Sequence, residues 1–155
     1  MSKSLKRVEA ALAAAGLTPE IREVGQARTA ADAAEAAGCA VDQIAKSIIF
    51  RGEETGHVVL FLTAGGNRVS PAKASAVAGQ RLGKADAELI HAETGFAIGG
   101  VSPVGHLTPV RAFFDPRLLE FAEIWAAAGT PRHIFRVAPG DLLRVTGAEA
   151  ADFTE

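Results

Sequence analysis

The chain contains a single cysteine among its 155 residues, which excludes two kinds of site. A lone thiol forms no internal disulfide and supplies no paired-cysteine metal site. Sparse cysteine fits a reducing compartment, so we expect a cytoplasmic protein. Cys39 has no cationic sequence neighbour that would stabilise a thiolate. Two interpretations stay open for it, a small buried hydrophobic residue and a reactive thiol.

Long apolar runs and a strong charge of one sign are missing too. No stretch reaches the roughly 18 apolar residues of a membrane span, and no apolar core of a signal peptide follows residues 1–6. The net charge is −2, which argues against a protein that holds nucleic acid by its overall charge. A basic rim confined to one part of the surface is compatible with this net charge. Arg68, Lys73 and Arg81 are candidates for that rim, with ordinary solvated charges as the alternative.

The familiar catalytic motifs are also lacking. The chain has no defensible Ser-His-Asp spacing, Walker loop, HExxH motif or Cys/His cluster, so we expect no metal and no cofactor. The glycine-rich run at 99–105 lacks the GxGxxG order of a dinucleotide site. Each of the four histidines, taken alone, is explained by a surface or structural role.

The apolar pattern predicts one α/β domain over residues 1–155. We expect a mixed, mainly antiparallel sheet with helices packed outside, in which closure into a barrel is one possible form. Helical spacing, capping residues and stopping glycines predict helices at 4–15, 29–38, 70–78, 85–93, 116–128 and 139–145, with a helical turn at 41–45. Apolar runs predict strands at 21–24, 47–50, 58–62, 110–114 and 134–137, and a strand end at 96–98. The strands 47–50 and 58–62 are apolar on both faces, which predicts a central hairpin.

Two features stand out from this pattern. The run 99–105 combines three glycines with Pro103, which specifies a backbone shape suited to binding with main-chain N–H groups. Lys46 comes just before the apolar run 47–50, where an ammonium must reach water or an anion because burial without a partner is costly. A lysine that extends along the surface to solvent is the alternative.

Three segments of the chain resemble the YbaK and prolyl-tRNA-synthetase-associated editing domains. They are 45–50 around Lys46, the loop 99–105, and 128–142, within a likeness that runs from about residue 27 to residue 153. The resemblance implies an editing-domain fold. Since no synthetase catalytic domain is attached, it also implies a free-standing enzyme that hydrolyses mischarged aminoacyl-tRNA in trans, on tRNA-Pro or a similar tRNA. The implied partner is the acceptor end of aminoacyl-tRNA.

The resemblance also implies roles for residues. A lysine at the position of Lys46 lines the substrate pocket, and residues 99–103 match a GxxxP loop whose main chain faces the substrate carbonyl. The candidate catalytic residues are therefore Lys46, Gly99, Gly100, Val101, Ser102 and Pro103, with the amides of Gly100 to Ser102 as oxyanion donors. An aminoacyl ester is already activated, so oxyanion stabilisation and a placed water suffice, and the resemblance suggests that the substrate's ribose hydroxyl or amino group is the base.

Six further residues are candidates for substrate binding. His133 lies where related synthetase domains carry a histidine that shapes the amino-acid pocket, and His106 borders the loop. For three of the six, Asn67, Arg68 and Ser70, a structural role is an equal alternative. The full set is Asn67, Arg68, Ser70, Gly105, His106 and His133.

Two other functions remain open from the sequence. One is a module that binds tRNA ends or aminoacyl groups without turnover, and the other is a hydrolase of small esters or aminoacyl-nucleotides. Turnover of mischarged tRNA excludes the first. Activity that survives removal of the tRNA body identifies the second.

Overall fold

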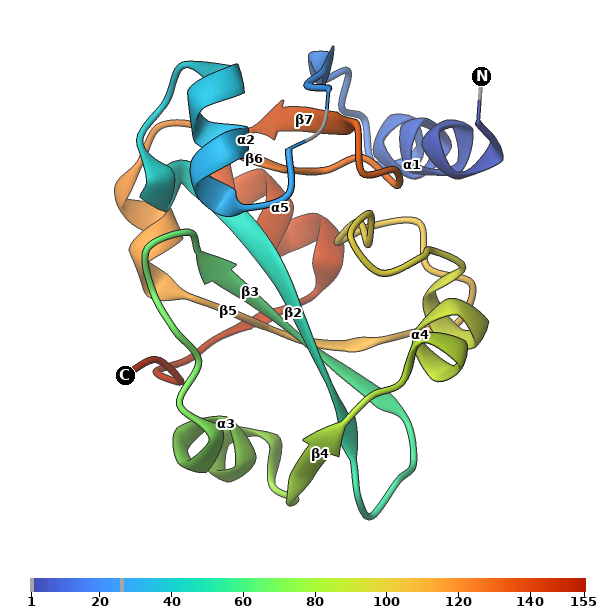
Figure 1. Cartoon of the computed structure of the whole chain (residues 1–155), viewed down its shortest axis with the longest axis vertical. Helices are drawn as coiled ribbons and strands as arrows, with labels where there is room; N and C mark the ends of the chain where they lie inside the picture. The colour runs from blue at the N-terminus through green and yellow to red at the C-terminus, as the bar shows by residue number, and fades with distance from the viewer. Residues whose placement is uncertain (1, 26) are drawn as a thin grey trace.

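A mixed sheet of eight strands organises the computed structural model, which describes residues 2–25 and 27–155 (Figure 1). The strands are β1 (Ile21–Glu23), β2 (Ile44–Gly52), β3 (Val58–Ala64), β4 (Leu82–Lys84), β5 (Arg111–Phe114), β6 (Ile124–Ala127), β7 (His133–Val137) and β8 (Glu149–Ala150). Their order is β1-β7-β6-β2-β3-β5-β8, and β4 pairs with β2. Four of the seven strand pairs are antiparallel, so the predicted mixed, mainly antiparallel sheet is confirmed. Among the described residues no pairing joins β1 to β8.

Helices connect most of the strands. They are α1 (Lys3–Ala14), α2 (Ala30–Ala37), α3 (Pro71–Ala78), α4 (Ala87–Thr94) and α5 (Pro139–Thr146), with 3-10 turns η1 (Val41–Gln43) and η2 (Pro116–Glu120). The side chains of Thr29 and Ser70 cap α2 and α3 by accepting from main-chain N–H groups. Gly38 and Gly79 end these helices with φ of 73° and 72°, a left-handed conformation that glycine adopts without strain. The helices predicted at 29–38 and 70–78 are therefore confirmed.

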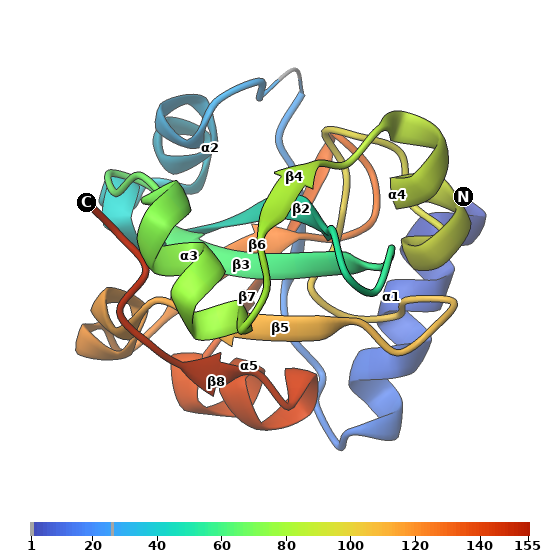
Figure 2. The same cartoon turned by 90° about the horizontal axis from the view of Figure 1, so that it is seen from below.

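The core lies on both faces of the central β2–β3 hairpin. Every residue of β3 is buried, as the predicted central strand requires. On one face α1, α4 and α5 pack against β3 in the larger cluster, whereas α3 covers Phe61 and Phe113 on the other (Figure 2). A third cluster joins α2 to Trp125 and Ile134, with Cys39 at its edge. Burial raises the pKa of the Cys39 thiol, which favours its hydrophobic role over a reactive one.

The helix predicted over 116–128 is wrong. A 3-10 turn covers Pro116–Glu120, and Trp125 lies in strand β6. β6 pairs in parallel with β2 at Ile44 and Ala45, and antiparallel with β7. β2 is about 80 positions away in the sequence and β7 is the neighbouring hairpin strand, so strand pairing overrides the helical spacing of the local apolar residues.

The strand end predicted at 96–98 is also wrong. Phe96 is fully buried while Ile98 is 61% exposed, and the segment forms a turn in which Gly100 N–H donates to Ala97 O. The short strands β4 and β8 were not predicted, because three-residue and two-residue strands carry too little pattern. Strand β2 begins at Ile44, so Lys46 is its third residue and does not precede it. Among the described residues no helix is long and apolar enough to cross a bilayer.

Candidate functional site

A cavity of about 860 Å³ opens at a gap in the sheet beside β2. On this edge β2 pairs with β6 only at Ile44 and Ala45, and with β4 only from Phe50 to Gly52. Residues 46–49 therefore have no strand partner there among the described residues. The cavity wall continues through residues 84–85, the loop 98–101, β6, the turn 130–134 and the N-terminal end of α2. The gap thus gathers segments that are far apart in the sequence.

The ionisable side chains that line the cavity are basic. They are Arg28, Lys46, Lys84 and His133, and none of the described lining residues is an aspartate or glutamate. Basic side chains without a carboxylate on the wall favour the binding of phosphate or another anion. Sequence reasoning missed Arg28 and Lys84. Arg28 directly precedes Thr29, the N-cap of α2, and a helix N-terminus beside an arginine is suited to binding an anion.

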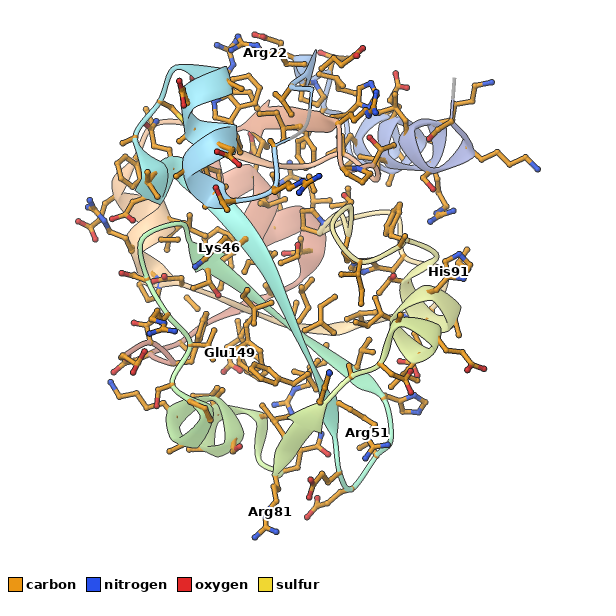
Figure 3. The ribbon with its side chains drawn as sticks, viewed as in Figure 1. Arg22, Lys46, Arg51, Arg81, His91 and Glu149 are labelled. Carbon is orange, nitrogen blue, oxygen red and sulfur yellow. The ribbon has the colours of Figure 1, made fainter. Side chains whose placement is uncertain are left out.

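Lys46 extends from β2 toward the loop that follows β3 (Figure 3). Its Nζ donates to the main-chain oxygen of Asn67 at 2.6 Å. Burial lowers the pKa of Lys46, and the charge of Arg68 lowers it further, while Asp115 and Asp42 act in the opposite direction. The ammonium is therefore held at the cavity wall by a neutral acceptor and carries no direct carboxylate partner among the described residues.

The glycine loop forms another part of the wall through Gly99 and Val101. Gly99 has φ of 93°, and a Cβ on Gly100 would lie 2.8 Å from the carbonyl carbon of Thr130, so glycine is required at both positions. The Gly100 N–H, predicted as an oxyanion donor, instead donates to Ala97 O and is occupied within the loop. Within the described chain, the N–H groups of Gly99, Val101 and Ser102 have no hydrogen-bond partner.

Ser102 and His106 stiffen the loop from inside. The buried Ser102 hydroxyl accepts from Val104 N, and its carbonyl oxygen lies 2.7 Å from Nε2 of His106. A carbonyl oxygen only accepts, so His106 donates from Nε2. Burial lowers the pKa of His106, and the charge of Arg7 adds to this while the bond to Ser102 opposes it. His106 thus acts on the loop as a structural donor.

His133 lies on the cavity wall at the start of β7. Its Nδ1 is 2.6 Å from the hydroxyl of Thr130, which also accepts from Arg132 N. Thr130 itself lines the cavity beside Gly99. The structure therefore brings Lys46, His133 and the loop residues Gly99 and Val101 to one cavity.

The other candidate residues, including Gly100 and Ser102 of the glycine loop, are not among the described residues that line this cavity. Gly105 and His106, with Pro103, line a second hollow of about 590 Å³ that also involves α1. Ser70 caps α3, and Arg68 is an exposed residue 3.9 Å from Glu155. Asn67 acts through its main-chain oxygen, as the acceptor for Lys46.

Two residues of the suggested basic rim also lie away from the cavity wall. Lys73 pairs with Asp152, and Arg81 points away from the molecule at the edge opposite α2 (Figure 3). Neither is among the residues that line the cavity. The alternative interpretation of Lys73 and Arg81 as ordinary surface charges is thus favoured.

Ser47 is a further wall residue that the sequence analysis did not single out. Its Oγ is buried, lines the cavity and has no hydrogen-bond partner among the described residues. A buried hydroxyl without a partner costs free energy unless a ligand or water satisfies it. A lone serine inside the apolar run 44–50 was the available sequence signal.

These features define a small α/β binding domain with a cationic cavity, lined on one side by an open glycine loop. Residues 24–145 match the family described as "Aminoacyl-tRNA editing domain". The chain belongs to this family.

Individual proteins are also similar to this chain. A crystal structure described as a candidate trans-editing enzyme for prolyl-tRNA synthetase is 46% identical, with a TM-score of 0.93 and coverage of 100% of this chain and 99% of that one. The structure of hypothetical protein APE2540 is 28% identical, with a TM-score of 0.87 over 96% of this chain and 99% of that one. The uncharacterised protein YwhH of Bacillus subtilis is 30% identical over 114 residues, 74% of this chain and 72% of YwhH.

Proposed function

We propose that this protein is a free-standing, cytoplasmic deacylase that hydrolyses the ester of mischarged aminoacyl-tRNA. The observation that carries the proposal is the meeting of Lys46 and the glycine loop in one cavity whose ionisable side chains are all basic. That lining suits the phosphate-rich acceptor end of a tRNA. The likeness to a candidate trans-editing enzyme for prolyl-tRNA synthetase favours mischarged tRNA-Pro as the first substrate to test.

The chemistry in this proposal is hydrolysis of an activated ester. Water attacks the ester carbonyl carbon, and the N–H groups of Val101 and Ser102 bind the developing oxyanion. The acyl–oxygen bond then breaks, the water proton passes to the leaving ribose oxygen, and free amino acid and deacylated tRNA result. A neighbouring ribose hydroxyl or the substrate's amino group relays that proton. One well-placed oxyanion donor is worth about 3 kcal/mol, or roughly a hundredfold in rate.

Lys46 orients the terminal nucleotide or its phosphate in this scheme. Its ammonium already has Asn67 O as an acceptor on one side, which leaves two further N–H groups for a ligand. His133 borders the same cavity and is the proposed contact to the amino-acid side chain. Editing in a separate hydrolytic pocket suits small side chains that binding alone discriminates poorly.

A deacylation assay over a panel of mischarged tRNAs tests the proposal. Wild-type protein should release the amino acid from at least one, with tRNA-Pro charged with alanine, cysteine, serine or threonine first. Lys46→Ala should lower kcat/KM by roughly 30- to 100-fold, since a hydrogen bond to a charged group is lost. The exposed Lys6→Ala on α1 is the matched control and should match wild type.

Three outcomes contradict the proposal in different ways. Binding of mischarged tRNA without turnover identifies a binding module. Equal rates on aminoacyl-tRNA and on a minimal aminoacyl-adenosine identify a small-ester hydrolase. Full activity in Lys46→Ala removes Lys46 from the mechanism.

A further inference from the structure

Arg7, on α1, contacts both ends of the segment that carries the glycine loop. Its Nε donates to Gly105 O at 2.7 Å, and Nη2 donates to Thr94 O at 3.4 Å. The guanidinium carbon lies 4.3 Å from the centre of the Phe96 ring, a cation–π contact. Thr94 and Phe96 precede the loop and Gly105 ends it. One half-buried side chain therefore ties the two ends together.

Glycines allow α1 to come this close. Gly95 and Gly105 both have φ of 80°. A Cβ on Gly95 would collide with the Arg7 guanidinium, and a Cβ on Gly105 would lie 3.3 Å from Arg7 O. Figure 1 shows α1 beside the segment that leaves α4. The contact is thus built into the backbone on both sides.

The glycine loop lies between Arg7 and the cavity. On the cavity side, Gly99 and Val101 form part of the wall, and Gly100 packs against the main chain of Thr130 and Pro131. On the other side are α1 and the hollow that Gly105 lines. α1 itself lies outside residues 24–145, the part that matches the family. The loop has no ladder of main-chain hydrogen bonds, so side chains decide how firmly it is held.

We propose that Arg7 is a positioning residue that holds the Val101 and Ser102 amides in their oxyanion-binding geometry from behind, an inference that rests on the proposed deacylase function. A guanidinium is suited to this because it donates in several fixed directions and stacks on an aromatic ring at the same time. Displacing a catalytic group by about 1 Å can cost a hundredfold in rate. Loss of Arg7 therefore acts on the chemical step more than on tRNA binding.

Steady-state deacylation of Arg7→Ala and Arg7→Lys tests the role. Arg7→Ala should lower kcat roughly 10- to 100-fold and leave KM within about twofold of wild type. Arg7→Lys should be intermediate, because an ammonium reaches Gly105 O but cannot also span to Thr94 O. Arg111→Ala is the matched control, since Arg111 also donates to a main-chain oxygen, Ala78 O, and lies 4.8 Å from a phenylalanine ring centre, on Phe113. Its kcat should equal that of wild type.

Hydrogen exchange provides a readout that does not depend on activity. Gly100 N and Val104 N are bonded within the loop, to Ala97 O and Ser102 Oγ. Their exchange should quicken by roughly tenfold or more in Arg7→Ala, and stay unchanged in Arg111→Ala. Exchange in β3 should be the same in both variants.

The results of these experiments either support or overturn the positioning role of Arg7. Wild-type kcat in Arg7→Ala overturns it, and so does an equal loss of kcat in Arg111→Ala. If Arg7→Ala does not fold, Arg7→Lys carries the same comparison. If wild-type protein deacylates no tRNA, the proposed function fails, and loop-specific exchange then decides alone whether Arg7 holds the loop.

Discussion

Nζ of Lys46 lies 2.6 Å from the main-chain oxygen of Asn67, so β2 and the loop after β3 meet at the cavity wall. The side chain of Asn67 donates to a carboxylate oxygen of Asp115 at 3.0 Å. The acceptor for Lys46 is therefore itself fixed by a buried acid. This chain of contacts places the ammonium at the cavity wall.

The pKa of Lys46 should be visible in the pH dependence of deacylation. Burial and Arg68 lower that pKa, so the ammonium loses its proton at a lower pH than an exposed lysine does, and the enzyme-dependent rate should fall as the pH rises through the lowered value. Lys46→Arg keeps its charge throughout, so its smaller rate should persist to higher pH. Initial rates between about pH 6 and about pH 10, corrected for spontaneous hydrolysis, measure this. An alkaline decline at the same pH in both proteins contradicts it.

Removal of the Asp115 carboxylate should destabilise the fold. This side chain is 3% exposed and accepts from Ala64 N, Asn67 Nδ2 and Arg117 N, each at 3.0 Å. Asp115→Ala leaves these donors unpaired, so the free energy of unfolding should fall by about 2–4 kcal/mol in urea titrations. Asp152→Ala, which breaks an exposed pair with Lys73, should cost less than about 0.5 kcal/mol. Equal losses in the two variants would refute the assignment.

Gly100→Ala should disturb the loop because of a steric clash. The added Cβ would lie 2.8 Å from the carbonyl carbon of Thr130, and that main-chain atom cannot move aside as a side chain does. We expect a loss of about 1–3 kcal/mol in unfolding free energy and a lower kcat. Gly140→Ala, at a helical position where an added Cβ would meet no atom beyond its own helix backbone within 4 Å, should be neutral or stabilising by up to about 1 kcal/mol. Normal kcat and stability in Gly100→Ala would show that the loop moves freely.

The two serines of the site should respond oppositely to removal of their hydroxyls. Ser47 Oγ is buried without a partner in the described structure, so Ser47→Ala should leave the free energy of unfolding unchanged or raise it by up to about 1 kcal/mol. Ser102 Oγ accepts from Val104 N at 3.2 Å, so Ser102→Ala should lower it by about 1 kcal/mol. Thermal and urea unfolding of the two variants, without substrate, makes the comparison. A destabilised Ser47→Ala would mean that water already satisfies its hydroxyl.

Local signals in the sequence determined much of the fold. The caps Thr29 and Ser70 and the stopping glycines Gly38 and Gly79 mark α2 and α3, because helix ends are stabilised by residues within three or four positions. The apolar runs of β2 and β3 mark the central hairpin in the same way, since its two strands are joined by a short polar loop. Lys46 and the glycine loop were also visible as candidates, because each interrupts its local pattern.

Tertiary structure alone decided where these candidates lie and what surrounds them. Trp125 has helical spacing yet belongs to strand β6, where it pairs in register with Ile44 of β2, 81 positions away. The cavity exists because β4 and β6 each stop short on the same edge of β2, which no local pattern encodes. Tertiary contacts also place Arg28 and Lys84 on the cavity wall. They place Gly105 and His106 in the separate hollow beside α1. Helix caps act over one turn of chain, whereas strand pairing and cavity walls depend on contacts between residues that the sequence holds far apart.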